Sequence, residues 1–200
     1  MWNRLMYDKK INIKKMNTTI SILKELNERR SVRAYLPKEI ESTKLEALWT
    51  AAQWAPSCSN KQDWHYYAVT GDARQKLAPV LAEGNAAWAL KAPLLLCVTR
   101  DTAAEVIAQS RPYGMYDAAL SVMCLVVEAE HQGLRARQMA GFDDDAFRAA
   151  LAIPANEAPV VIISVGYEDA AMTNLDPAMQ EREKMRPPRK QITEIVTVVK

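Results

Sequence analysis

Four short stretches of the chain place polar side chains beside residues that end a helix or turn the backbone. The first, Arg29-Arg30-Ser31-Val32-Arg33, holds three guanidinium groups and a hydroxyl within five residues. Guanidinium groups form rigid, charge-assisted hydrogen bonds with phosphate oxygens, so this stretch suits a phosphorylated ligand. The same cations would also complement the C-terminal end of a helix dipole. Taken alone, the stretch favours that simpler role.

The second stretch, from Ala55 to Trp64, connects a predicted helix to a predicted strand. Its short hydrogen-bonding side chains are followed by amides, and Asn60 and Gln62 can both donate and accept at the edge of a heteroaromatic ring. An ordinary turn would have a similar composition. Cys58 has no obvious base nearby, so a small filler residue is a better interpretation than a nucleophile.

The third and fourth stretches lie in the second half of the chain. Met139 and Gly141 precede a predicted helix, where backbone amides exposed at the glycine could meet an electron-rich ligand atom. A tight turn would look the same. Arg189 and Lys190 belong to a proline-stiffened basic segment that begins at Arg186. A solvated run of charges is the alternative there.

Composition and charge narrow the class of protein. The chain has 200 residues and a net charge of +2, which suits one domain and does not by itself indicate nucleic-acid binding. Residues 1–15 contribute +4 of that charge, and the rest contributes −2. We expect residues 1–15 to be a basic extension, disordered or not native, and residues 16–200 to form a single domain.

Neither a signal peptide nor a membrane-spanning segment is predicted, because no apolar run is long enough. The three cysteines are widely spaced and fit reduced thiols in a cytoplasmic protein. With six glycines and no phosphate loop, a Rossmann enzyme is not expected.

Apolar periodicity predicts helices and strands in irregular alternation, as in a three-layer α+β domain. The expected helices are about 19–29, a helix from Thr43 with a Thr43–Glu46 capping box, 115–132 and 143–151; the expected strands are 64–70, 94–99, 160–166 and 192–199. A free edge at 192–199 would invite aggregation, so we expect this strand to reach a partner subunit.

In this order and spacing, the stretches resemble the FMN-dependent nitroreductase family over about residues 20–198. The matching positions are Arg29, Arg30, Ser31 and Arg33; Ala55 to Trp64, with Asp63 in place of a proline; Asp117 to Ala119; Gly141 to Asp143; and Arg189, Lys190 and Glu194 to Val196.

The resemblance implies a three-layer fold with a central mixed, mostly antiparallel sheet flanked by helices, and a C-terminal strand exchanged with a partner subunit. It implies FMN as cofactor, NADPH or NADH as electron donor, and a homodimer with FMN sites at the subunit interface. Electrons would pass to a small organic acceptor, such as a nitroaromatic compound or a quinone, by a ping-pong mechanism. The flavin N5 would carry the chemistry, so no catalytic side chain is expected.

Roles follow from the resemblance position by position. Arg29, Ser31 and Arg189 would hold the phosphate and ribityl chain, and Arg33 would reach the pyrimidine side of the flavin. Asn60, assisted by Gln62, would bind the pyrimidine edge, and the Gly141 amide would lie near N5. Pro56, Ser57 and Ser59 would serve the flavin held mainly by the other chain. The remaining predicted cofactor-binding residues are Arg30, Met139 and Lys190.

Two departures from the family pattern bear on specificity. Asp63 would put an acid beside the flavin region, and Ala140 stands where many members carry an acidic residue. The segment 101–113 is short, which predicts an open or small substrate pocket.

Two other functions stay open from the residues alone. One is a flavin-binding or flavin-modifying protein of the same fold without general reductase activity. The other is a non-enzymatic module whose basic tail binds an anionic partner.

Overall fold

A four-stranded sheet runs through the centre of the domain, with the strand order β1-β2-β6-β5. Its strands are β1 (Trp64–Thr70), β2 (Leu94–Asp101), β5 (Arg135–Met139) and β6 (Glu157–Gly166), and all three of their pairings are antiparallel. The computed structural model describes residues 21–199. The predicted basic extension and the beginning of the first expected helix therefore lie outside the described residues.

Strand β2 shows why the sheet is buried on both faces. Its residues Leu94, Leu96 and Val98 pack into one apolar cluster, and the intervening Leu95 and Cys97 pack into the other. Successive side chains of a strand point to opposite faces, so a continuous apolar run requires a layer on each side. Burial raises the pKa of the Cys97 thiol to about 12.

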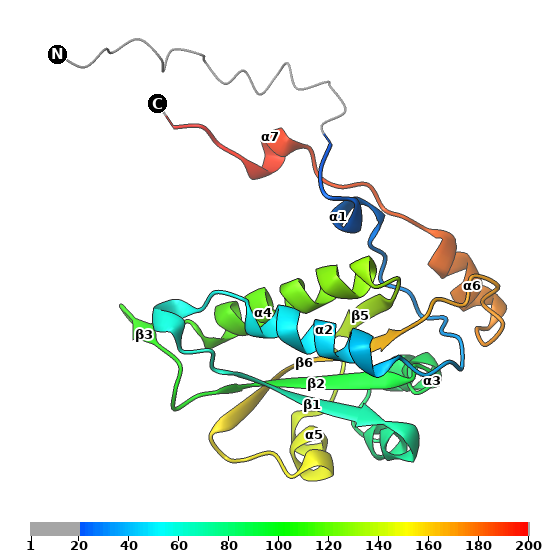
Figure 1. Cartoon of the computed structure of the whole chain (residues 1–200), viewed down its shortest axis with the longest axis horizontal. Coiled ribbons are helices and arrows are strands. Elements are labelled where there is room, and N and C mark those ends of the chain that lie inside the picture. Colours follow the sequence, from blue (N-terminus) through cyan, green and yellow to red (C-terminus); the bar gives the residue numbers. More distant parts are fainter. Residues whose placement is uncertain (1–20, 200) are drawn as a thin grey trace.

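Helices supply those two layers (Figure 1). Helices α2 (Ser42–Gln53) and α4 (Gly114–His131) pack together on one face of the sheet. On the other face lie α5 (Asp144–Leu151), α3 (Glu83–Ala89) and the 3₁₀ helix η3 (Gly71–Leu77), which share a core built around Trp88 and Phe147. The predicted three-layer α+β architecture is confirmed.

The C-terminal region departs from its prediction. Helix α6 (Pro177–Lys184) precedes an extended segment, and residues 192–195 form a single helical turn, α7 (Ile192–Ile195). The predicted strand 192–199 is therefore wrong for this chain. A capping box between Gln191 and Glu194 fixes the turn instead, because the two residues bond each other's backbone amides. Exchange of this segment with a partner subunit stays a prediction.

Other predictions also need correction. The expected capping box at Thr43 is wrong, because α2 already begins at Ser42 and no side chain caps it. Helix α1 (Lys24–Glu28) is shorter than expected. The short segment 101–113 carries a small hairpin of β3 (Ile107–Ala108) and β4 (Arg111–Pro112). Among residues 21–199, no helix combines the length and apolarity that a bilayer crossing requires.

Candidate functional site

A hollow of about 690 Å³ opens between the segment after α1, strand β5 and the chain from α6 onward. Seven arginines and one acid, Glu183, contribute to its lining. The arginines are Arg29, Arg30, Arg33, Arg137, Arg182, Arg186 and Arg189. The structure therefore brings together the first and fourth of the predicted stretches, which lie more than 150 residues apart in the sequence. Lys190, also predicted, is exposed and does not line the hollow.

Arg29 lies where positive charges crowd together. Its Nη1 donates to the Ser31 hydroxyl over 3.1 Å. Burial lowers the pKa of Arg29, and the like charges of Arg189 and Arg186 lower it further. Arg186 itself donates to the main-chain oxygen of Asn27. Since like charges repel, this arrangement favours a bound anion.

Glu183 neutralises part of the cluster. Its Oε1 accepts from the Arg33 amide over 2.7 Å, and its Oε2 accepts from Arg33 Nη1 over 2.8 Å. Arg30 donates to the Glu183 main-chain oxygen. The side chain of Glu183 is buried, so its pairing with Arg33 is shielded from water. Arg33 is paired with an acid of α6 that the sequence did not single out, and its predicted contact with the pyrimidine side of the flavin stays a prediction.

Arg137 was missed at the level of sequence. It lies on β5, where its Nη1 donates to the Ser31 main-chain oxygen over 2.6 Å and its guanidinium lies 5.2 Å from the Trp88 ring centre. Its Nε is buried and has no partner among the described residues. The only signal was a short alternation of apolar and polar residues over 134–137, which is typical of a strand with one buried face but is broken at Gln138.

Gly141 approaches α3 closely. Its carbonyl accepts from the Ala82 amide over 3.0 Å and from Asn85 Nδ2 over 3.2 Å. A Cβ at this position would lie 3.1 Å from Asn85 Nδ2, so the contact favours glycine. Within the described part of the chain, the Gly141 amide donates no hydrogen bond. Asn85 is a further neighbour that sequence reasoning missed, and the Met139 side chain is buried in the core.

The second predicted stretch forms a strained turn. Ser59, Asn60 and Gln62 all have positive φ, at 53°, 54° and 50°. Residues other than glycine rarely adopt this conformation, and such strain is concentrated at functional sites. The Ser57 hydroxyl accepts from the Gln62 amide over 2.9 Å, and Gln62 Nε2 donates to Asn60 Oδ1 over 3.1 Å. The turn is thus held by its own side chains.

Asp117, near the start of α4, also anchors this turn, since its Oδ2 accepts from the Cys58 amide over 2.9 Å. The turn follows α2 at the opposite end of that helix from α1 and α6 (Figure 1). No residue of the turn lines the arginine hollow. Within one chain, the structure therefore does not bring together the arginines and the predicted residues of the turn, which are Pro56, Ser57, Ser59, Asn60 and Gln62.

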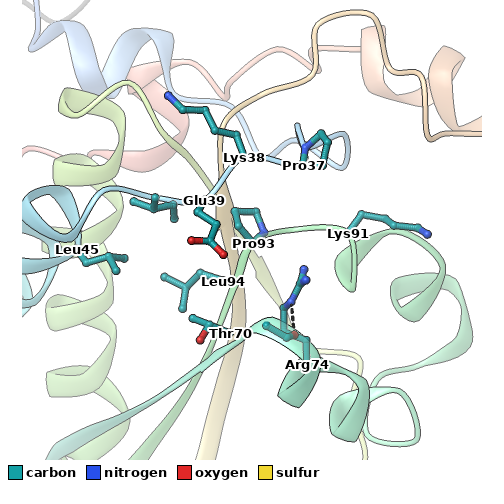
Figure 2. A pocket seen from close by; sticks show the side chains of 11 residues that line it. Pro37, Lys38, Glu39, Leu45, Thr70, Arg74, Lys91, Pro93 and Leu94 are labelled. Atoms are coloured by element: carbon teal, nitrogen blue, oxygen red, sulfur yellow. Dashed lines mark hydrogen bonds between the residues drawn. The ribbon is translucent and has the colours of Figure 1, made fainter.

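A second hollow, of about 460 Å³, lies between the start of α2 and the ends of β1 and β2 (Figure 2). Its lining combines apolar side chains such as Leu94 with four charged residues, Lys38, Glu39, Arg74 and Lys91. The Arg74 guanidinium is committed to main-chain oxygens, with Nε donating to Gly71 over 2.9 Å and Nη1 to Leu90 over 3.0 Å. None of the predicted site residues lines this second hollow. The candidate site is therefore the arginine hollow.

The sequence and the fold are both similar to those of known proteins. Residues 26–87 and 82–167 match the model of a family described as the nitroreductase family. A Stenotrophomonas maltophilia protein named NADH dehydrogenase/NAD(P)H nitroreductase is 29% identical over 165 residues, covering 71% of this chain and 82% of its own. A crystal structure described as an oxidoreductase containing FMN superposes with a TM-score of 0.80 at 24% identity, covering 90% of this chain and 92% of that one. A nitroreductase family protein of Clostridium difficile superposes with a TM-score of 0.72 at 23% identity, over 89% of this chain and 98% of the other.

Proposed function

The chain belongs to the nitroreductase family, and on that premise we propose that it is an NAD(P)H-dependent FMN oxidoreductase that passes electrons to a small organic acceptor. A nitroaromatic compound or a quinone is the class of acceptor we expect. The observation that carries the proposal is the convergence of Arg29, Ser31 and Arg189 on one arginine-lined hollow.

The residues of this hollow fit the phosphate end of FMN. A phosphate monoester carries a charge of about −1.5 to −2 and three strong acceptor oxygens. Arg29 and Arg189 repel each other in its absence, and the Ser31 hydroxyl lies beside Arg29. A dianion placed among them would relieve that repulsion and receive charge-assisted hydrogen bonds.

Gly141 and Asn85 supply polar groups of a different kind. The Gly141 amide donates no hydrogen bond to any of residues 21–199, so it can donate to an electron-rich ring atom, as the resemblance implied. Asn85 Nδ2 lies within hydrogen-bond distance of the Gly141 carbonyl and stabilises the loop that carries that amide. When bound, FMN supplies the hydride-accepting chemistry, so the chain needs only to bind, orient and shield it.

We infer that the site is completed by a second copy of the chain. The strained turn of residues 56–62 is remote from the arginines of its own chain, so its amides can serve a flavin only across an interface. Large apolar side chains are exposed near this turn and along α4: Trp54 is 81% exposed, Tyr116 61% and Met115 51%. Apolar patches of this kind are typical of surfaces that a partner covers. A homodimer with two FMN sites at its interface accounts for both features.

Binding of FMN tests the site directly. Arg29→Ala removes a charge-assisted contact to phosphate, worth roughly 1.5–3 kcal/mol, so the dissociation constant for FMN should rise about tenfold to about a hundredfold. Flavin fluorescence titration of the protein stripped of FMN measures this constant. Arg148→Ala on α5, outside the hollow, is the matched control. Unaltered FMN affinity in Arg29→Ala would show that the phosphate lies elsewhere.

Turnover tests the activity. The FMN-loaded protein should oxidise NADPH or NADH when a quinone or nitroarene is present. Because one open site would serve donor and acceptor in turn, double-reciprocal plots should be parallel, which is typical of ping-pong kinetics. A protein that holds FMN but turns over neither dinucleotide would contradict the reductase activity.

A further inference from the structure

The arginine hollow holds more positive charge than one flavin phosphate requires. A bound phosphate would balance about two of its seven arginines, and Glu183 balances one more. The other polar partners of these arginines are uncharged, since Arg30 and Arg186 donate to main-chain oxygens. About four positive charges therefore stay unbalanced within the described residues.

Arg137 and Arg182 belong to this unbalanced charge. No carboxylate pairs with either of them in the described part of the chain, whereas their neighbour Arg33 is paired with Glu183. Burial lowers the pKa of Arg137 most, and the positive charges of Arg33 and Arg182 lower it further, whereas the negative charge of Glu183 raises it. Arg182 is exposed and lines the hollow, so an incoming ligand can reach it.

Arg29 and Arg137 define two parts of one hollow. Arg29 is crowded by Arg186 and Arg189, whereas Arg137 is crowded by Arg33 and Arg182. Arg137 is tied to the first part through the Ser31 main-chain oxygen, 2.6 Å from its Nη1. A second anionic group could therefore occupy the hollow next to the flavin phosphate.

From this arrangement, and resting on the proposed function, we propose that Arg137 and Arg182 bind the 2′-phosphate of NADPH and make the enzyme select NADPH over NADH. The two donors differ only in that phosphate, a dianion near neutral pH. Arg137 and Arg182 form no ion pair within residues 21–199, so together they match this phosphate in charge. Arginine is well suited to the role, because its planar fork presents paired donors to phosphate oxygens.

Binding of two adenosine nucleotides isolates the 2′-phosphate from the redox reaction. Calorimetry with the FMN-loaded protein should show 2′,5′-ADP binding at least about tenfold more tightly than 5′-AMP. In Arg182→Ala, this advantage should fall to about threefold or less, because an unpaired cation is lost. Arg148→Ala should keep the wild-type advantage. Added salt should reduce the advantage, since Arg182 is exposed and its interactions are screened.

Steady-state kinetics provides the second readout. The ratio of kcat/KM for NADPH to kcat/KM for NADH should exceed about ten in the wild type and should fall in Arg182→Ala, mainly through the KM for NADPH. Equal use of both donors, or equal binding of the two nucleotides, overturns the inference and leaves the proposed reductase intact. Selective 2′,5′-ADP binding without oxidation of either donor would retain the phosphate site and contradict the reductase.

Discussion

The carboxyl group of Asp63 is buried in the interior of the protein. It is 4% exposed, and neither of its carboxylate oxygens has a hydrogen-bond partner among the described residues. Burial raises its pKa above the usual 3.8, and the negative charges of Asp117 and Glu105 raise it further. The Arg100 charge opposes them weakly, because Arg100 is already paired with Glu105. The carboxylate form of Asp63 is therefore destabilising in the folded protein.

The direction of the pH effect follows from this shift. Below pH 3.8 the Asp63 carboxyl is protonated in both the folded and the unfolded chain, so it lowers the free energy of unfolding little. As the pH rises from 3.8 through the raised pKa of the folded state, the unfolded chain loses the proton first, and the free energy of unfolding falls. Above the pKa of the folded state, Asp63 is ionised in both states and the free energy of unfolding keeps its full reduction.

Asp63→Asn should therefore stabilise the protein at neutral pH. An unsatisfied buried polar group costs about 1–3 kcal/mol, and more when charged, so we expect a gain of about 1–3 kcal/mol near pH 7. The neutral amide would also remove the repulsion by the negative charge of Asp117. Both effects act in the same direction.

Urea unfolding at a series of pH values measures the gain. The protein concentration must be constant, because the stability of the proposed dimer would depend on it. Asp72→Asn is the control, because it removes the same charge from an exposed position. The advantage of Asp63→Asn should shrink as the pH falls toward 3.8. A less stable variant at neutral pH, or an advantage independent of pH, would refute the reasoning.

Two further substitutions test other contacts. Gly166→Ala would place its Cβ 2.5 Å from Pro93 Cδ, so it should lower the free energy of unfolding by about 1–3 kcal/mol. The Cβ of Gly84→Ala would meet nothing within 4 Å, so this variant should gain roughly 0.5 kcal/mol because alanine is the better helix former. Equal effects of the two substitutions in thermal unfolding would contradict the packing around Gly166. Asp117→Ala removes the acceptor of the Cys58 amide and frees the strained turn, so it should weaken FMN binding about fivefold or more. Asp117→Asn keeps an acceptor oxygen and should restore FMN binding. Unchanged FMN affinity in Asp117→Ala would show that the turn does not contribute to the flavin site.

Strongly patterned segments were predictable from the sequence. Residues 64–70 form β1 as expected, and the apolar runs at 94–99 and 160–166 lie within β2 and β6. Asp143 caps α5 by accepting from the Ala146 amide, and Gly133 follows α4 with a φ of 73°. Local chemistry decides each of these features, because side-chain period, capping and positive φ depend on near neighbours in the chain.

Polar segments were not predictable in this way. Strand β5 was not predicted because arginines and a glutamine occupy most of it. Helix α6 was not predicted because its eight residues show little apolar periodicity. Each depends on tertiary contacts: β5 pairs with β6, and Glu183 of α6 is fixed by Arg33. Conversely, the apolar residues at 192–199 predicted a strand that the chain on its own does not form.

The sequence by itself determined which side chains are available: arginines for a phosphate, amides in a turn and a glycine before a helix. Tertiary structure decided which of them share a site. It joined Arg29 to Arg189, added Arg137 from β5, bound Arg33 to Glu183 and separated the turn from the arginines. The physical reason is that an ion pair or a crowd of like charges depends on distances of a few ångströms between segments far apart in the chain, and only the folded packing of the sheet and its helices sets those distances.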